Sequence, residues 1–385
     1  MNVVYLDYNR TTPLAGAVRQ AMLPFLDDFY AAPGNPHWQS RAVEEAIEDA
    51  RSMVASLMGC SASEIIFTSG GTESTNLALL GAARVVNSHA GRSRRHAIVS
   101  SLEHRPVAAV ADFLETQGWD ITRLPSNTGG FIDPDDLAKA LKKQTRLVSI
   151  QLANGYLGTC QKIADLTRIP RPEHCLFHTD ATQAFGKLEV DVGSLGVDLL
   201  SLSGHRMYAS KGVGALYIRH GVHLESLMHG SWEENGLRPG LLNPASLVGL
   251  GVAAQLVKAG EQDIEERLST LQRKLWQGLQ QETGDALRRH GSSSQALPNT
   301  SCFSLGQLNC DTLLAKMPEL HLGVPLSANF VSAKTYDRSC FHAIGVDQAQ
   351  AHGILCASLG WNTTEDEIDR AIGLISQAYR AAIGS

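Results

Sequence analysis

The chain of 385 residues has no excess of positive charge and no long hydrophobic run. Its net charge is −6 and its pI is near 6.2, so the electrostatic footprint of a nucleic-acid-binding protein is missing. No apolar stretch reaches the roughly 18 residues that a membrane span needs, and Asp7 comes too early for the apolar core of a signal peptide. We therefore expect a cytoplasmic protein with no nucleic-acid or membrane partner.

Paired cysteines are also missing. The seven cysteines include no Cys-x-x-Cys pair, which excludes the usual zinc pattern and gives no sign of a disulfide framework. We expect no metal site. Cys310 and Cys340 are candidates for reactivity only in the weak sense that any cysteine is. We favour the interpretation that both are buried, unreactive thiols.

The composition is that of a globular protein, with 43% hydrophobic and 19% charged residues. Apolar runs at 65–67, 97–99, 145–152 and 176–180 are separated by helical stretches, which predicts an α/β protein with a mostly parallel sheet and helices on both faces. Helical spacing over 43–57 ends at Gly59, a long helical region runs from Pro244 to Leu279, and Thr363 to Ile368 contains a capping-box start for the last helix.

A chain of this length suits a large domain with a smaller one. We expect residues 15–258 to form the large domain and residues 1–14 with 259–385 to form the small one. The long helical region should bridge the two domains.

Several polar residues follow the expected strands. Gly70 and Gly71 lead from the first strand into a helix whose N-terminus is a ready anion site. Ser203 and His205 follow the strand at 197–200 and could both donate to a phosphate, although a plain turn is the alternative interpretation.

Residues 201–214 read Ser-Leu-Ser-Gly-His-Arg-Met-Tyr-Ala-Ser-Lys-Gly-Val-Gly. This segment resembles the cofactor-lysine segment of the cysteine desulfurases, which are pyridoxal-phosphate (PLP) enzymes of the class V aminotransferase group. The opening Asp7–Pro13 and the glycine turn at 68–76 match as well. The resemblance implies the fold type I PLP-transferase architecture, with a mostly parallel seven-stranded sheet, helices on both faces and a smaller α+β domain.

The resemblance also implies site residues. Thr72 would bond the PLP phosphate, His104 would stack on the pyridine ring, Asp180 would hold a proton on the pyridine nitrogen and Gln183 would reach the phenolic oxygen. Without the resemblance, His104 could be structural, and Asp180 could cap a helix beginning at Ala181. The complete set of implied cofactor-binding residues is Gly71, Thr72, His104, Asp180, Gln183, Ser203 and His205.

Arg206 is the main departure from the family pattern. It stands where the family has the lysine that forms a Schiff base with PLP, and a guanidinium with a pKa above about 12 is not a usable amine nucleophile. Arg10 stands where a small residue is usual and would add a cation to the ligand pocket, although an exposed loop arginine is an equal alternative.

Other residues that the family uses are also replaced. The family's nucleophilic loop cysteine has no counterpart in 326–334, and Cys340 does not inherit its role. Cys356 stands at the place of the carboxylate-binding arginine. Leu241 replaces a threonine that binds phosphate across the dimer interface, and Gly155 replaces an asparagine near the phenolic oxygen.

These losses predict a desulfurase-like protein without the usual PLP-lysine chemistry. We expect a non-catalytic homodimer with a ligand-binding, regulatory or scaffolding role. Any PLP that it binds would be bound noncovalently, and a sulfur-relay or other protein is a candidate partner. The alternative is an enzyme with altered chemistry on a noncovalent PLP or pyridoxamine-phosphate adduct, or on another anionic ligand held by Arg10 and Arg206. If the lysine had been replaced by Arg206 through protein engineering, this would explain that one loss but none of the other losses.

Overall fold

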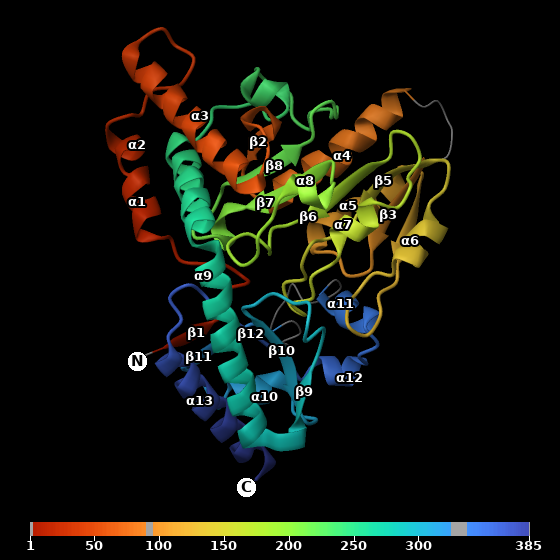
Figure 1. The fold of residues 1–385 in the computed structure, drawn as a ribbon, viewed down its shortest axis with the longest axis vertical. Helices are drawn as coiled ribbons and strands as arrows, with labels where there is room; N and C mark the ends of the chain where they lie inside the picture. Colours follow the sequence, from red (N-terminus) through yellow and green to blue (C-terminus); the bar gives the residue numbers. More distant parts are fainter. Residues whose placement is uncertain (1–2, 90–94, 325–336, 385) are drawn as a thin grey trace.

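The computed structural model describes residues 3–89, 95–324 and 337–384, and its main feature is a seven-stranded sheet (Figure 1). Every strand pair in it is parallel except those of β8, which is antiparallel to both of its neighbours. The mostly parallel seven-stranded sheet is therefore confirmed. The strand order is β2 (Ile65–Thr68), β8 (Gly214–Ile218), β7 (Leu199–Ser203), β6 (Leu176–Asp180), β5 (Thr145–Ser149), β3 (Arg95–Ser100) and β4 (Trp119–Leu124).

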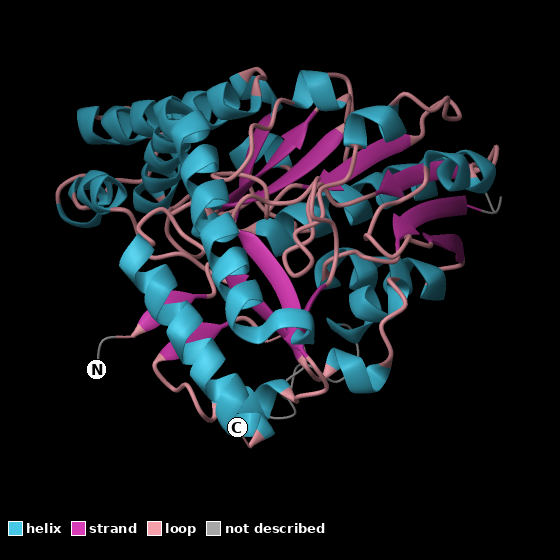
Figure 2. Cartoon of the chain, turned by 60° about the horizontal axis from the view of Figure 1, so that its bottom comes forward, coloured by secondary structure: helices cyan, strands magenta, loops and turns pink. Residues whose placement is uncertain are grey.

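Helices cover both faces of this sheet (Figure 2). Successive residues of β3 show why: Ile98 packs in the cluster that contains α3 and the first half of α9, whereas Ala97 and Val99 pack with α4 and α5, as the alternation of side chains along a strand requires. The helices around the sheet are α1 (Gly16–Met22), α2 (Pro24–Asp27), α3 (Trp38–Met58), α4 (Gly71–His89), α5 (Arg105–Thr116), α6 (Pro134–Ala140), α7 (Ile163–Thr167) and α8 (Val192–Leu195).

A second hydrophobic cluster lies below the large sheet in Figure 1. It is built on a three-stranded antiparallel sheet in the order β12 (Ile354–Ser358), β10 (Thr300–Leu305) and β9 (Leu287–Arg289), and on the parallel pair of β1 (Val4–Leu6) with β11 (Leu320–Leu322). The N-terminal strand thus pairs with a segment more than 300 residues away. The helices here are α10 (Cys310–Leu314), α11 (Asp337–Ala343), α12 (Gln348–Ala351) and α13 (Glu365–Ile383).

Helix α9 (Pro244–Thr283) runs through both regions (Figure 1). Asn243 caps its first turn, since the Asn243 side chain accepts from the Ser246 N–H, and Pro244 occupies the first helical position. Its residues up to Val257 belong to the upper cluster, and those from Leu268 onward belong to the lower one. The predicted bridging helix is confirmed, and the predicted boundary at 258 falls inside it; the division into domains stays a prediction.

The helix ends follow the local signals in the sequence. Gly59 ends α3 in the left-handed conformation at φ 70°, and Thr364 with Glu367 forms a complete capping box at α13. Two details differ. Strand β5 ends at Ser149, short of the predicted 152, and the alternative of a helix beginning at Ala181 is not observed, because residues 182–187 form turns.

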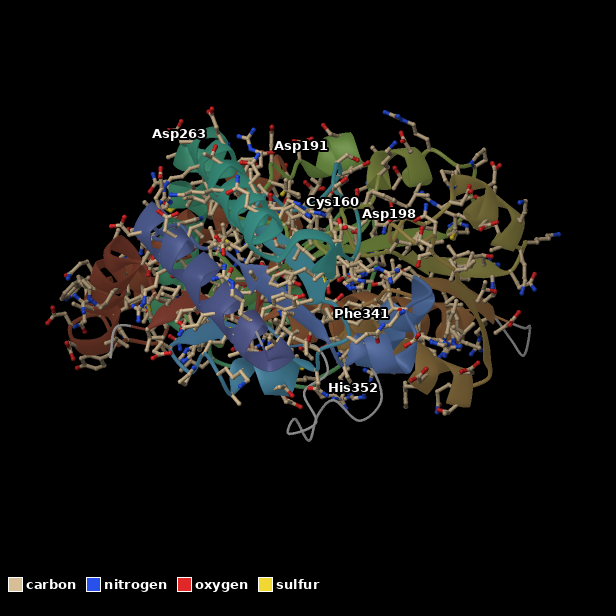
Figure 3. All side chains as sticks on the ribbon, turned by 90° about the horizontal axis from the view of Figure 1, so that it is seen from below. Cys160, Asp191, Asp198, Asp263, Phe341 and His352 are labelled. Atoms are coloured by element: carbon tan, nitrogen blue, oxygen red, sulfur yellow. The ribbon has the colours of Figure 1, made fainter. Side chains whose placement is uncertain are left out.

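Helix α11 carries Phe341, which is labelled in Figure 3, and packs against the residues that follow β3. Phe341 of α11 is fully buried and shares a cluster with Leu102, which follows β3, and with Leu157. Within the described residues, no helix is both long and apolar enough to cross a membrane.

Candidate functional site

Two adjoining cavities lie at the carboxyl ends of the parallel strands β3, β6 and β7, where ligands bind in open α/β sheets. The glycine-loop cavity is lined by the turn before α4 and by the residues after β7. The thiol-side cavity is lined by Arg10, Glu103, Tyr156, Cys340 and Cys356 among others.

All nine residues that the sequence singled out line these cavities. Their roles stay predictions, but their convergence in one place is observed. Gly71, Thr72, Ser203 and His205 line the glycine-loop cavity, Arg10 and Gln183 line the thiol-side cavity, and His104, Asp180 and Arg206 line both.

The start of α4 is shaped to receive an anion. The helix begins at Gly71, and the first N–H groups of a helix have no intrahelical acceptor, so they and the helix dipole favour a negative group in front of them. A Cβ atom on Gly71 would lie 2.6 Å from Cγ2 of Thr182. Glycine at this position therefore lets the helix N-terminus approach the end of β6.

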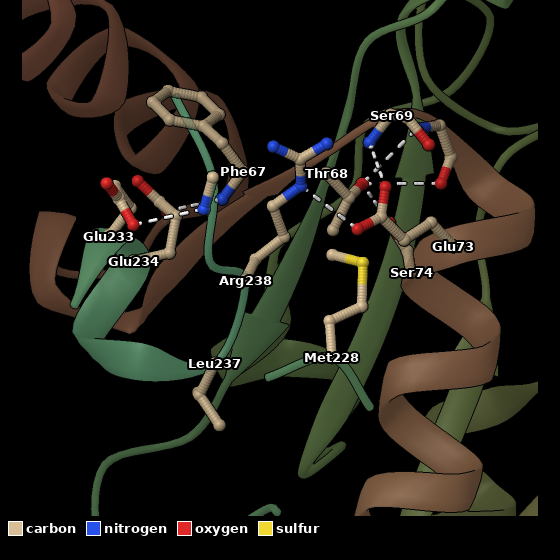
Figure 4. A network of polar contacts seen from close by, with 12 residues as sticks. Phe67, Thr68, Ser69, Glu73, Ser74, Met228, Glu233, Glu234, Leu237 and Arg238 are labelled. Atoms are coloured by element: carbon tan, nitrogen blue, oxygen red, sulfur yellow. Dashed lines mark hydrogen bonds and ion pairs between the residues drawn. The ribbon is translucent and has the colours of Figure 1, made fainter. Parts of the chain in front are cut away.

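Glu73 fixes the shape of the turn that precedes α4 (Figure 4). Its carboxylate accepts from the Ser69 N–H at 2.6 Å and pairs with Nε of Arg238 at 3.1 Å. Arg238 lies in the segment 232–243, so this segment is tied to the glycine turn through one ion pair.

Asp180 is buried at the end of β6, and Oδ1 of its carboxylate accepts from the Thr182 N–H at 2.9 Å. On the same strand, His178 is held between the hydroxyl groups of Ser149 and Ser201, at 2.8 and 2.9 Å. Burial lowers the pKa of His178 to about 4, so this imidazole is neutral at pH 7.

His205 is also neutral. Burial, with the nearby positive charge of Arg206, lowers the pKa of His205 to about 4, and its Nδ1 lies 3.1 Å from the Thr11 hydroxyl. A neutral imidazole that uses one nitrogen for Thr11 presents the other to a ligand. His205 can therefore serve the cavity as a single hydrogen-bond partner and not as a cation.

Arg206 lies between the two cavities and lines both. Its Nη1 donates to the backbone carbonyl of Asn9, which also accepts from Nε2 of Gln183 at 3.2 Å. Burial lowers the pKa of Arg206, yet a guanidinium keeps its charge in proteins. A fixed cation thus lies between the two cavities, at the position where the family resemblance predicts a lysine.

Asn9 joins the cavities to the lower part of the molecule. Its N–H donates to Oγ of Ser358 at 2.9 Å, and its Nδ2 donates to the Gly155 carbonyl and to Oγ1 of Thr300, both at 2.8 Å. Its Oδ1 accepts from Nδ2 of Asn299 at 3.1 Å. The loop that contains Asn9, whose carbonyl accepts from Arg206, is therefore held rigidly by β10, β12 and the large sheet.

Lys187 provides the only other buried amine close to this cluster among the described residues. Burial lowers the pKa of Lys187 to about 7, but its Nζ donates to the backbone oxygen and to Oε1 of Gln183, at 2.9 and 3.2 Å. Lys187 lines neither cavity. Its observed contacts orient Gln183.

Gly155, which stands where the family resemblance predicts an asparagine, leaves no space for a side chain. A Cβ atom on Gly155 would lie 2.3 Å from Nε2 of Gln183. Any larger residue would displace Gln183, so the carboxamide of Gln183 occupies the space beside the Gly155 backbone.

Positive charge reaches the thiol-side cavity from the loop after β1. Nη1 of Arg10 donates to the Tyr156 hydroxyl at 3.2 Å, so Arg10 belongs to the cavity and not to solvent alone. Asp7 lines the same cavity, and burial raises the pKa of Asp7 to about 6 against the opposing effect of Arg10 and Arg206.

Glu103 is a site residue that the sequence reasoning missed. Its Oε1 accepts from the Ser100 hydroxyl at 2.5 Å and from the Gln151 N–H at 2.8 Å, while Oε2 is buried without a hydrogen-bond partner in the described structure. Burial is the main reason that the pKa of Glu103 rises to about 8. The one available signal was its place beside His104 at the end of a strand.

Two thiols line the thiol-side cavity, one of them at the position where the family resemblance predicts an arginine. Cys340 of α11 and Cys356 of β12 both line it, and Cys356 is 3% exposed. Cys340 lies within α11. The segment 326–334, in which no nucleophilic cysteine was found, lies outside the described residues. Within them, no cluster of His, Cys, Asp or Glu is arranged to hold a metal ion.

Sequence comparison places the chain among known proteins. The profile of the family "Aminotransferase class-V" matches residues 4–371. The cysteine desulfurase IscS of Dictyoglomus turgidum is 39% identical over 375 residues, which cover 97% of this chain and 94% of that protein. The human cysteine desulfurase is 36% identical over 375 residues, with 96% and 80% covered.

Solved structures agree with these matches. A structure described as a NifS-like protein superposes with a TM-score of 0.90 at 31% identity and covers 97% of this chain and 98% of its own. A structure of SspA in complex with cysteine has a TM-score of 0.79 at 33% identity, with 92% and 98% covered. The architecture is therefore that of the fold type I proteins.

Proposed function

The chain belongs to the class-V aminotransferase family and is cysteine-desulfurase-like, and from that premise we propose that it binds a PLP-type anionic ligand without a covalent bond and does not desulfurate cysteine. One observation carries the proposal. The side chain at the carboxyl end of β7 that lines both cavities is the guanidinium of Arg206, tied to the Asn9 carbonyl.

The residues present fit PLP except for its covalent anchor. The N-terminus of α4, Thr72, Ser203 and the neutral His205 supply donors for a phosphate, and the buried Asp180 can hold a proton on a pyridine nitrogen. PLP, when bound, supplies an electron sink for reactions at an amino acid's α-carbon. In this chain the surrounding residues can bind and orient such a ring, while Arg206 offers no amine to join it.

The site also lacks an arginine to bind the substrate carboxylate at the position where the family resemblance implies one. Cys356 lies there, and its thiol donates to the Tyr156 carbonyl at 3.1 Å. Arg10 and Arg105 are exposed cations that line the cavity, and Arg10 contacts the Tyr156 hydroxyl. An amino acid would thus lose the bidentate contact that fixes its orientation, which supports a binding role more than desulfuration.

The proposed protein is a homodimer whose two-domain subunit comprises residues 15–258, and 1–14 with 259–385. Exposed apolar side chains in the segment 232–243 support the dimer: Trp232 is 86% exposed and Leu241 is 67% exposed. Arg238 of this segment contacts Glu73 beside the glycine-loop cavity, so a partner packed on the segment would lie near the ligand. A sulfur-relay or regulatory protein is the proposed class of further partner.

A second function is favoured by Glu103. A neutral carboxylic acid with one unpartnered oxygen lines the cavity beside His104, and such a group can donate a proton or a hydrogen bond. The alternative is therefore an enzyme that acts on a noncovalently bound PLP or pyridoxamine-phosphate adduct through residues other than Arg206.

Sulfide release separates these possibilities. Purified protein supplied with PLP and cysteine should release no sulfide above the level of R206A, its matched variant without the guanidinium. Sulfide release that disappears in R206A would contradict the proposal. Turnover of an added pyridoxamine-phosphate adduct that survives in R206A and is lost in E103A would support the alternative.

A further inference from the structure

Three thiols gather on one wall of the thiol-side cavity. Cys340 and Cys356 line the cavity, and Cys302 lies directly opposite Cys356 in the register of β10 and β12. Cys302 and Cys356 are 1% and 3% exposed. The proposed ligand-binding function uses none of these thiols.

The backbone brings Cys302 and Cys356 into the geometry of a cross-strand pair without mutual hydrogen bonds. The N–H and C=O groups of Cys356 both bond to Gly323, at 2.8 Å, and the C=O of Cys302 accepts from His290. Opposite residues of this kind in antiparallel strands have Cα atoms about 4.5 Å apart, with side chains on the same face. That separation lies inside the range in which a disulfide forms without backbone movement.

The neighbouring thiols act on Cys302. Burial, together with the Cys356 and Cys340 thiols, raises the pKa of Cys302 well above its ordinary value. Cys302 is therefore a poor first nucleophile. Cys356 is the member of the pair that lines the cavity, so an entering disulfide meets Cys356 first.

We propose that Cys356 and Cys302 form a thiol–disulfide exchange site whose substrates are low-molecular-weight disulfides that enter the thiol-side cavity. The Cys356 thiolate attacks one sulfur of the disulfide RSSR, breaks its S–S bond and releases RS⁻, which leaves RS attached to Cys356. The Cys302 thiol then gives up its proton, attacks Sγ of Cys356 and releases the second RS⁻. As the Cys302–Cys356 bond forms, the protein loses two protons and two electrons, and RSSR gains both to become two thiols.

This proposal is independent of PLP binding, because no step involves Arg206 or the glycine-loop cavity. Oxidation removes the S–H donor that Cys356 gives to the Tyr156 carbonyl. The exchange site would thus change the same wall of the cavity that carries the Arg10–Tyr156 contact.

The test uses the full chain, reduced and freed of reductant, with hydroxyethyl disulfide as the probe. Intact mass should fall by two hydrogen atoms, and a non-reducing peptide map should show Cys302 joined to Cys356. The variant C302S should stop at the first step and carry one mercaptoethanol on Cys356, while C356S should not react at this wall. C310S is the matched control, because Cys310 is fully buried and lines neither cavity, and it should oxidise like the unchanged protein.

Three results would overturn the proposal. They are a mixed disulfide on Cys340 in place of Cys356, an absence of reaction in folded protein, and a reaction of all cysteines together only at denaturant concentrations that unfold the chain. Circular dichroism of each variant before the reaction separates a loss of chemistry from a loss of fold.

Discussion

At the scale of single residues, Arg206 decides what the site can do. Its guanidinium shares the Asn9 carbonyl with Gln183, and Asn9 is bonded in turn to Ser358, Thr300 and Gly155. The arginine is therefore held in place by buried contacts and does not rest loosely in the pocket. A change at position 206 should alter chemistry more than it alters the fold.

The variant R206K tests this at one residue. A lysine can lose its proton and join PLP covalently, so we expect R206K to keep a visible absorbance band through dialysis, whereas the unchanged protein loses PLP.

R206K should still release no sulfide from cysteine. Cys356 cannot bind the substrate carboxylate as an arginine would, and such catalytic groups act as a unit. A variant that binds no PLP would show that the glycine-loop cavity does not accept it, and one that desulfurates cysteine would show that our assignment of the missing groups is wrong. R10K, which changes the other pocket arginine, is the matched control and should lose PLP on dialysis.

Glu103 gives a prediction about pH. Because its pKa is raised from 4.5 to about 8, the folded protein keeps a proton that the unfolded chain releases above about pH 4.5. Raising the pH from 5 to 8 therefore destabilises the fold, by at most about 1.4 kcal/mol per pH unit. E103Q has no proton to release, so its free energy of unfolding relative to the unchanged protein should grow with pH across this window.

Urea denaturation at pH 5, 6.5 and 8 measures this difference. E115Q, on the exposed side of α5, is the control for removal of a carboxylate. A gap between E103Q and the unchanged protein that is constant with pH would mean that Glu103 is ionised in the fold.

At the scale of elements, the close approach of α4 to β6 creates the anion site. A Cβ on Gly71 would meet Cγ2 of Thr182 at 2.6 Å, so G71A must move the helix N-terminus or Thr182, at a cost of about 1–3 kcal/mol. We expect G71A to bind pyridoxamine phosphate about tenfold or more weakly in a fluorescence titration. G16A is the matched control, because a Cβ on Gly16 meets nothing within 4 Å, and it should bind normally. Equal affinities in the two variants would remove the α4 N-terminus from the site.

The elements show which parts of the site were predictable from the sequence. The glycine turn at the start of α4, Asp180 at the end of β6 and Ser203 at the end of β7 could be placed because the carboxyl ends of parallel strands meet at one edge. Glu103 was missed because a buried neutral carboxyl group looks like any glutamate in a sequence. The alternative interpretation of Asp180 as the cap of a helix at Ala181 is not supported: the Asp180 carboxylate accepts from the Thr182 N–H in a turn, and a short local pattern does not distinguish a turn from a helix start.

At the scale of the whole molecule, the two hydrophobic clusters share α9, and the cavities lie where β1, β10 and β12 meet the large sheet. The fold class and the long bridging helix followed from periodicity and family resemblance. The contacts of Asn9 did not, because its partners lie 146 to 349 residues away, and no local pattern encodes such distances. The facing thiols of Cys302 and Cys356 escaped prediction for the same reason.

Assembly is the prediction that belongs to the whole molecule. If the segment 232–243 forms a dimer interface, light scattering at micromolar concentration should give the mass of two chains. L241R should shift the equilibrium toward the monomer, because it puts a charge among apolar groups, while the exposed change F113R, on α5, should not. A monomeric mass for the unchanged protein would refute the dimer.

The central claim is that this family member holds its ligand without a covalent bond. Borohydride reduction of the protein saturated with PLP, followed by intact mass and peptide mapping, tests it most directly, with R206K as the positive control. We predict no mass gain in the unchanged chain and a gain of one reduced PLP on the lysine of R206K. A reduced PLP found on the unchanged chain, on Lys187 in particular, would show that another amine has taken over the lysine's role and would contradict the account.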